Sequence, residues 1–339
     1  MRRMESRRKT IEPCIEVRVA SQDREAQETR DLADLAAALC RTPREIPSKF
    51  FYDEAGSELF ERITELPEYY QTRTERALLE SIADRLVEAS GATELVEIGA
   101  GAATKTRVLL DALERAGRLR LYVPLDVDES MVRRVAAELT AEYPGLCVHG
   151  VVGDFMAHLG HIPDGGGPEA RRLVLFLGGT LGNLRPEAAR RFLEELRSEM
   201  APGDSFLLGA DLVKPVARLE AAYDDAAGVT AEFNRNILNV VNRRTGGDFD
   251  PTAFRHRALY DRERCWIEMR LVSLQRQEVQ LPALGLSFTL EEGEEILTEI
   301  SAKYDRLRLE ELLRGAGFEP VAWFIDPEGL FGLSLSRAG

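Results

Sequence analysis

The 339-residue sequence has few residues suited to a metal site or to disulfide bonds. Its four histidines show no HExxH or similar spacing. Its four cysteines are scattered, with no CxxC pair; they are Cys14, Cys40, Cys147 and Cys265. Such scattered cysteines are typical of buried, reduced thiols rather than of a zinc site or a disulfide framework. We therefore expect no bound metal and no metal-based chemistry.

Long hydrophobic runs are also missing. The basic N-terminus, MRRMESRRKT, is not followed by the apolar segment of a signal peptide, and no apolar run reaches transmembrane length. Positive charge is in the minority, with 44 Lys and Arg against 58 Asp and Glu and a net charge of −14. A field of that sign repels phosphate backbones. We expect a cytoplasmic monomer that binds neither membranes nor nucleic acid.

The middle of the chain alternates strand patterns with helix patterns. Buried strands are predicted at 94–100, 120–127, 146–154, 172–180 and 205–211, with helices between them. This alternation predicts an α/β fold with a mostly parallel sheet, which binds ligands beyond the carboxyl ends of its strands. After a helix at 306–316, the segments 319–326 and 330–336 predict a C-terminal antiparallel hairpin.

The pattern of helical and strand segments along the sequence also predicts how the chain is divided into domains. Residues 1–30 are charged and aperiodic, as in a disordered tail. Residues 80–212 and 303–339 carry the α/β pattern and are expected to form the sheet domain. Residues 31–79 and 213–302 combine helical segments with antiparallel strand patterns. We expect them to form a second, smaller α+β unit over the carboxyl edge of the sheet.

Two glycines at the end of the first predicted strand, Gly99 and Gly101 in EIGAG, are the sharpest local signal. Glycine lets the backbone approach a ligand closely, although an ordinary tight turn explains the pattern equally well. Thr104 stands where the dinucleotide fingerprint GxGxxG has its third glycine. Because S-adenosylmethionine has no pyrophosphate to grip, this departure favours it over NAD.

Acidic residues follow the next two strands. Asp126 is placed to accept hydrogen bonds from ribose hydroxyls, and Asp154 from an adenine amino group, with Phe155 packing on the ring. Each aspartate alone could instead be a helix N-cap. Lys105, in the first turn of the following helix, could reach the methionine carboxylate or could be a solvated surface lysine. Signals at three successive strand ends together favour a cofactor site.

Several long segments resemble the histidine-specific methyltransferase family. They are FFYDEAGSELFERITELPEYYQTRTE, EIGAGAATKT, LDVDES, LGGTLGNL, YDDAAGVTAEFNRNILNVVNR and TEISAKY. The resemblance runs from about residue 31 to the C-terminus. It implies a Rossmann-like class I methyltransferase domain, with a seven-stranded sheet, beside a smaller substrate-binding domain. It also implies S-adenosylmethionine-dependent trimethylation of L-histidine to hercynine, for ergothioneine biosynthesis.

The resemblance further implies a set of substrate-binding residues. Their implied roles are the substrate carboxylate for Asn183 and Tyr223, the amino group for the backbone of Gly178, the imidazole for Glu299 and Ser301 with Met269 beside it, and the pocket wall for Tyr52 and Tyr70. Glu299 and Ser301 stand two apart on an extended stretch, so their side chains point to one face. There the carboxylate would accept from one imidazole nitrogen and the hydroxyl would donate to the other.

Each of these residues also has a purely structural interpretation. Asn183 could be a turn residue, Tyr70 and Tyr223 could be interfacial packing, and Met269 could be core. Glu299 and Ser301 could be a surface pair. No residue stands out as a dedicated catalytic base, so solvent is the expected proton acceptor.

Other functions stay open at this stage. The same fold could methylate another amino acid or amine, such as tryptophan. An NAD-type dehydrogenase is less favoured, because Thr104 interrupts the glycine motif and no acid–base pair for hydride transfer is evident. A noncatalytic binding module that keeps the fold is a further alternative.

Overall fold

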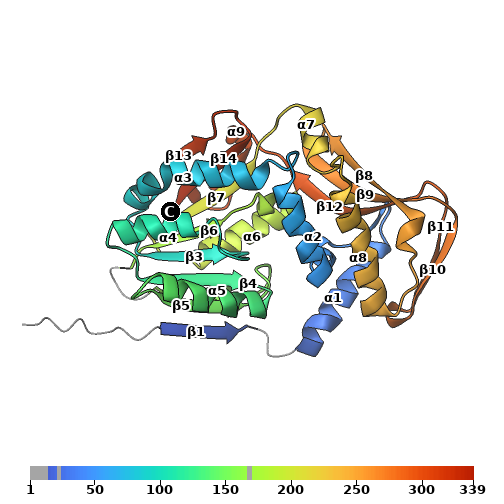
Figure 1. Ribbon diagram of the computed structural model, residues 1–339, viewed down its shortest axis with the longest axis horizontal. Helices are drawn as coiled ribbons and strands as arrows, with labels where there is room; N and C mark the ends of the chain where they lie inside the picture. Colours follow the sequence, from blue (N-terminus) through green and yellow to red (C-terminus); the bar gives the residue numbers. More distant parts are fainter. Residues whose placement is uncertain (1–13, 21–23, 166–169) are drawn as a thin grey trace, which may run out of the picture.

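The computed structural model describes residues 14–20, 24–165 and 170–339. Within them, eight strands form one large sheet in the order β1-β5-β4-β3-β6-β7-β14-β13 (Figure 1). The strands are β1 (Cys14–Val19), β3 (Glu94–Ile98), β4 (Leu121–Asp126), β5 (Cys147–Val152), β6 (Arg172–Phe176), β7 (Ser205–Asp211), β13 (Phe318–Ile325) and β14 (Phe331–Ala338). Only β14 runs antiparallel to its neighbours, β7 and β13. The predicted parallel sheet with a C-terminal antiparallel hairpin is confirmed.

Helices cover both faces of this sheet. They are α3 (Gln71–Ser90), α4 (Arg107–Arg115) and α5 (Glu129–Glu142) on one face, and α6 (Pro186–Ser198) and α9 (Arg306–Gly315) on the other. Successive strand residues enter opposite cores: Leu95 packs with α3, α4 and α5, whereas Val96 packs with α6 and α9. Because side chains of a strand alternate between faces, a strand covered on both sides must be apolar throughout. This explains the continuous hydrophobic runs in the sequence.

A second, smaller sheet lies beyond the carboxyl ends of the parallel strands (Figure 1). Among the described residues it holds four strands in the order β2-β12-β9-β8. These are β2 (Arg44–Glu45), β8 (Phe254–Asp261), β9 (Trp266–Ser273) and β12 (Glu295–Ala302), with the hairpin of β10 (Gln277–Leu281) and β11 (Leu286–Leu290) nearby. A third core joins it to α1 (Arg24–Leu39), α2 (Glu54–Glu65) and α8 (Val229–Thr245). None of the helices in the described ranges is long and apolar enough to cross a bilayer.

The two sheets meet where β12 ends and β7 ends. Leu212 and Tyr304 form a parallel bridge, in which the Tyr304 amide donates to the Asp211 carbonyl at 2.9 Å. The Val213 amide donates in turn to the Tyr304 carbonyl at 2.9 Å. These hydrogen bonds bring the last residues of β12 to the carboxyl end of the large sheet. Residues about 90 positions apart in the sequence therefore share one site.

Three boundary predictions need correction. Residues 14–19 form β1, which pairs in parallel with β5, so the sheet has eight strands instead of the expected seven. The predicted tail 1–30 is therefore wrong for β1 and for residues 24–30, which begin α1; residues 1–13 and 21–23 lie outside the described ranges. The expected boundary at 79/80 falls inside α3, a continuous helix. β1 was missed because the hydrophobic pattern of a short edge strand is weak within a charged sequence. The boundary at 79/80 was misplaced because α3 continues through it without a break.

Candidate active site

The glycine turn follows β3 and has the backbone that its sequence predicts. Gly99 and Gly101 have φ of +69° and +50°, in the left-handed region that favours glycine. A Cβ built on either residue would meet nothing within 4 Å, so the dihedral angle, not crowding, calls for glycine. The turn is held to the neighbouring strand β4 by the Gly99 amide, which donates to the Leu125 carbonyl at 2.8 Å. The open space beside both glycines leaves room for a ligand to approach the backbone.

Asp126 ends β4 beside this turn. Its Oδ2 accepts from the Gly101 amide at 2.9 Å, and its Oδ1 accepts from the Asp128 amide at 3.1 Å. These two bonds fix a half-buried carboxylate at the strand edge, and each oxygen has a further lone pair. Such an acceptor beside a glycine turn fits the hydroxyl groups of a ribose. The residues present thus fit an adenosine-type cofactor.

Asp154 and Phe155 follow β5 along the same edge. The Asp154 Oδ1 accepts from the Met156 amide at 2.8 Å, so part of this carboxylate caps a short turn, as the structural alternative proposed. The Phe155 ring packs against Phe176 and Phe192, with centroids 5.4 Å away in both cases. Phe155 is half-buried, just after the carboxyl end of β5. Both residues lie where the sequence predicts them.

Lys105 has a partner that the sequence reasoning missed. Its Nζ forms an ion pair with Glu75 of α3, a carboxylate that is 0% exposed. Glu75 also accepts from the Gly178 amide at 2.9 Å, and a Cβ on Gly178 would lie 3.6 Å from the Lys105 Nζ. Glu75 therefore joins the lysine of the cofactor side to the glycine turn after β6. An ammonium has three N–H donors, so Lys105 keeps further donors for a ligand.

The substrate side is organised around a second buried carboxylate, Asp211 at the end of β7. Its oxygens accept from the Tyr70 hydroxyl at 2.9 Å and from the Lys303 Nζ at 2.9 Å. Lys214 forms a further ion pair with the same carboxylate. Burial raises the pKa of Asp211, but the two ammonium groups outweigh it and hold that pKa below its ordinary value. Asp211 is therefore ionised and holds the end of β7 against β12.

Tyr223 and Ser301 lie on the other side of Lys303. The Lys303 Nζ donates to the Tyr223 hydroxyl at 2.9 Å and to the Ser301 Oγ at 2.8 Å. The Tyr223 hydroxyl lies 2.8 Å from the Ser301 Oγ, to which it donates. The two hydroxyls predicted to bind opposite ends of the substrate are therefore in direct contact. A substrate that reaches both must hold its two polar groups close together, as an α-amino acid with a short polar side chain does.

Glu299 lies two residues before Ser301 on the same face of β12, directly opposite Met269 of β9. Burial raises the pKa of the Glu299 carboxyl to about 7, with the Lys303 charge opposing the shift. Met269 is 2% exposed and belongs to the third core. The Glu299 carboxylate therefore lies beside the apolar Met269 side chain, and an ionised group in such surroundings needs a polar partner.

Tyr52 connects the two sides. Half of its side chain is exposed (51%), and its ring packs edge-on against Phe60 and Phe233. The surrounding protein desolvates its hydroxyl and raises its pKa, and the charges of Glu299 and Asp126 add to the increase. Tyr52 therefore lies near Glu299 of the substrate side and Asp126 of the cofactor side.

Asn183 and Tyr70 complete the predicted set. Asn183 ends η3 (Thr180–Asn183), which packs so closely on β12 that a Cβ on Gly182 would lie 2.7 Å from the Ala302 carbonyl oxygen. Asn183 is therefore next to the Ser301 region. Tyr70 is 1% exposed, and its hydroxyl is engaged by Asp211 and Lys214. In this structure the Tyr70 hydroxyl bonds to the buried Asp211 and Lys214 side chains, and almost no part of the residue is exposed to a pocket.

A further chain of hydrogen bonds holds Tyr223 from behind. The Asn234 amide donates to the His256 Nδ1 at 2.8 Å, which leaves the proton on Nε2, and Nε2 donates to the Tyr223 carbonyl at 2.8 Å. Thr298 donates to the Asn234 side-chain oxygen at 2.6 Å. Burial lowers the pKa of His256, so the ring stays neutral. This chain was not predicted, since a lone histidine in a strand carries no spacing signal.

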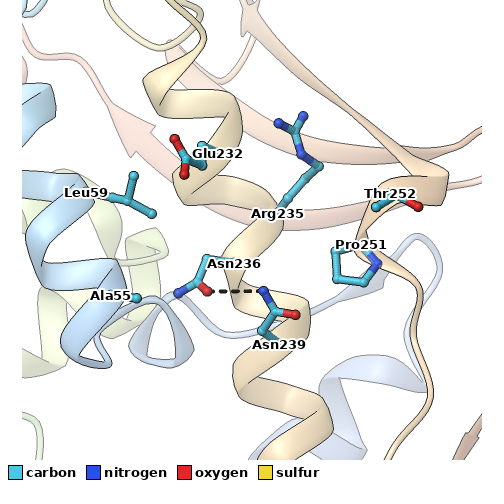
Figure 2. Close-up of a pocket in the computed structure, with 8 residues that line it drawn as sticks. All are labelled: Ala55, Leu59, Glu232, Arg235, Asn236, Asn239, Pro251 and Thr252. Carbon is cyan, nitrogen blue, oxygen red and sulfur yellow. Dashed lines mark hydrogen bonds between the residues drawn. The ribbon is translucent and has the colours of Figure 1, made fainter.

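The surface pocket shown in Figure 2 is separate from this site. It has a volume of about 250 Å³ and lies between α2, α8 and η4 (Pro251–Ala253). Within its lining, the Asn239 amide donates to the Asn236 oxygen at 3.3 Å (Figure 2). None of the predicted site residues lines it. In the described part of the chain, no group of three or more His, Cys, Asp or Glu is placed to hold a metal ion.

The fold and this site define the class of protein: a class I, S-adenosylmethionine-dependent methyltransferase. The chain belongs to the family of histidine-specific, SAM-dependent methyltransferases, whose profile matches residues 31–338. It is 48% identical to the histidine N-alpha-methyltransferases of Mycolicibacterium smegmatis and of Mycobacterium tuberculosis, each over 89% of this chain and 93% of the relative. It is 30% identical to the ergothioneine biosynthesis protein 1 of Neurospora crassa, over 87% of this chain and 34% of that longer protein.

Proposed function

We propose that this chain transfers methyl groups from S-adenosylmethionine to the α-amino nitrogen of L-histidine, three times in succession, to give hercynine for ergothioneine synthesis. The observation that carries the proposal is the contact between the Tyr223 and Ser301 hydroxyls, with Glu299 on the same face of β12, at the carboxyl edge of the sheet that also holds the glycine turn. The 48% identity to two histidine N-alpha-methyltransferases supports the same substrate.

In this proposal the strand edge binds the cofactor. Gly99 and Gly101 let the ligand approach the backbone, and Asp126 accepts from the ribose hydroxyls. Lys105 uses a donor that its ion pair with Glu75 leaves free to hold the methionine carboxylate. Asp154 and Phe155 hold the adenine. When bound, the cofactor supplies a methyl group already activated by the positive sulfur.

The substrate residues keep the roles that the resemblance implies, with one change. Asn183 and Tyr223 hold the carboxylate, the Gly178 backbone lies near the amino group, and Glu299 and Ser301 bind the imidazole above Met269. The Tyr70 hydroxyl donates to Asp211, so we assign Tyr70 the role of holding that carboxylate in place of lining the pocket. Tyr52 alone offers an aromatic face to the cationic product, which is favourable for a quaternary ammonium. All these groups come from one chain, which favours an active monomer.

The attacking nitrogen must lose its proton before it can react. The α-amino group of a free amino acid titrates near pH 8, and desolvation in the site favours the neutral amine. The carboxylate beside Gly178, that of Glu75, is already paired with Lys105, so we expect solvent to take the proton. The protein then contributes mainly by holding amine and methyl group in line, which removes much of the entropic barrier.

Product analysis tests the proposal. The purified protein is incubated with S-adenosylmethionine and either L-histidine or L-tryptophan, and the products are identified by mass spectrometry. We expect histidine to gain three methyl groups on one nitrogen and tryptophan to remain unmodified, because the indole offers no acceptor nitrogen to Ser301. Methylation of tryptophan in preference to histidine would assign the chain to the alternative substrate. A substrate-selectivity control is Glu299→Ala, which we expect to weaken the preference for histidine.

A further inference from the structure

Lys303 is the least exposed charged group near the substrate side, with a side chain that is 0% exposed. It lies two residues after Ser301, where β12 reaches the end of β7. Its three N–H donors have three acceptors: Asp211 Oδ2 at 2.9 Å, Tyr223 Oη at 2.9 Å and Ser301 Oγ at 2.8 Å. An ammonium has three donors and no acceptor, so this arrangement satisfies it fully.

Lys303 keeps its charge in this buried cluster. Asp211 is shared by two ammonium groups, those of Lys214 and Lys303. Burial disfavours the Lys303 ammonium, but the Asp211 carboxylate outweighs it and raises the pKa of Lys303 above its ordinary value. Burial lowers the pKa of Lys214 to about 8 despite the same partner. Lys303 is therefore the more firmly charged of the two ammonium groups, and it is the one that bonds to Tyr223 and Ser301.

The hydrogen bonds of Lys303 also set the direction of the two hydroxyls. Because Tyr223 and Ser301 both accept from an ammonium, each keeps its own O–H as a donor. In the structure the Tyr223 hydroxyl donates to Ser301. A hydroxyl can rotate, so a bound carboxylate takes over the Tyr223 donor, while the Ser301 O–H is left to donate to the imidazole. A ligand at this point meets donors and positive charge, and so it must present acceptors.

We propose that Lys303 is a positioning and specificity-determining residue that makes the site select substrates with a free α-carboxylate, acting through Tyr223 and Ser301. The inference rests on the proposed function, because it concerns the substrate of that reaction. It predicts that histamine, which is histidine without its carboxylate, is a poor substrate. A neutral residue at position 303 removes the ammonium charge and the hydrogen bonds to Tyr223 and Ser301. Much of the preference for histidine over histamine should be lost with them.

The variant Lys303→Met tests this, with kcat and KM measured for histidine and for histamine. We expect the histidine KM to rise about 10- to 100-fold, with a much smaller change in kcat and in cofactor affinity, because the Tyr223 and Ser301 hydroxyls that hold the substrate lose their charged hydrogen-bond partner. The preference for histidine over histamine falls by a similar factor. Asp211 keeps Tyr70 and Lys214 as partners in this variant, which favours folding.

Lys214→Met is the matched control. It removes the other ammonium from Asp211 but leaves the bonds from Lys303 to Tyr223 and Ser301 in place. We expect it to lower stability, yet to raise the histidine KM far less than Lys303→Met and to keep most of the preference over histamine. Equal losses of preference in the two variants would overturn the role assigned to Lys303.

The other possible outcomes distinguish failure of the proposed function from failure of the role assigned to Lys303. If the unmodified protein does not methylate histidine, the proposed function fails. If it methylates histidine and histamine with equal kcat/KM, or if Lys303→Met keeps both the KM and the preference, only the present inference fails. Should circular dichroism show that Lys303→Met is unfolded, Lys303→Gln, which retains a donor but no charge, is judged on the same two measurements.

Discussion

The cofactor side and the substrate side of the site are both built from aspartates at strand ends, but they hold these carboxylates differently. Asp126, after β4, accepts from two backbone amides and is half-buried. Asp211, after β7, is 4% exposed and accepts from Tyr70, Lys214 and Lys303, which come from three segments of the chain. One carboxylate is left available for a ligand, whereas the other is used to join two sheets. The same residue at the same place in a fold thus serves binding in one case and assembly in the other.

The largest effect should come from Asp211→Ala. This change leaves Lys303 buried without a counter-charge, and breaking a buried ion pair in this way costs about 3–5 kcal/mol of unfolding free energy. Urea denaturation followed by circular dichroism measures it. Asp126→Ala is the matched comparison and should cost about 1 kcal/mol, since it loses only hydrogen bonds from backbone amides. Equal destabilisation by the two changes would remove the distinction between the two sides.

Asp126→Ala should instead act on cofactor affinity. The lost bonds from ribose hydroxyls to a charged acceptor correspond to an increase in Kd of about 10- to 100-fold. Isothermal titration calorimetry with S-adenosylhomocysteine measures this directly, without turnover. An unchanged Kd would show that the carboxylate at the end of β4 does not contact the cofactor.

Asn183→Ala probes the substrate side where η3 meets β12. Losing one hydrogen bond to the substrate carboxylate should raise the histidine KM about tenfold. Steady-state kinetics at saturating cofactor measures it, and the Kd for S-adenosylhomocysteine serves as the control that should stay constant. A change in cofactor affinity with an unaltered histidine KM would place Asn183 on the wrong side of the site.

The smallest expected effect concerns pH and Glu299, whose pKa is raised by burial to about 7. Below that pKa the carboxyl is protonated and is a weaker acceptor for imidazole; above it the ionised form dominates. Between pH 6 and pH 8 the ionised fraction grows about tenfold, and the histidine kcat/KM should gain by up to that factor. Glu299→Gln cannot titrate, so its profile should lack this component while keeping those of the substrate. Superimposable profiles would contradict the role of Glu299.

Much of the fold was predictable because its signals are local. The strands β3, β6 and β7 are buried throughout and mostly apolar, and the positive φ of Gly99 and Gly101 follows from a glycine turn at the end of a strand. β1 was missed, because a short, partly exposed edge strand in a charged segment has no clear pattern. Its pairing with β5 depends on a partner more than 120 residues away.

In the site, too, the residues could be recognised from local sequence, whereas their long-range partners could not. Glu75 and Lys303 stand inside the motifs QTRTE and TEISAKY, and Asp211 ends a predicted strand just as Asp126 does, so each could have been singled out. Their partners could not have been predicted. Lys303 reaches Asp211 only because β12 runs on to bridge with the end of β7.

The order of amino acids alone was enough to establish the parallel sheet, the glycine turn with its neighbouring acids, and the family, because each depends on residues close together in the chain. Which charges are buried, that the Tyr223 hydroxyl meets Ser301, and that the Tyr70 hydroxyl bonds to Asp211 were decided only when distant segments packed together. Desolvation and hydrogen-bond direction depend on all the neighbours of a group, and those neighbours exist only in the folded protein.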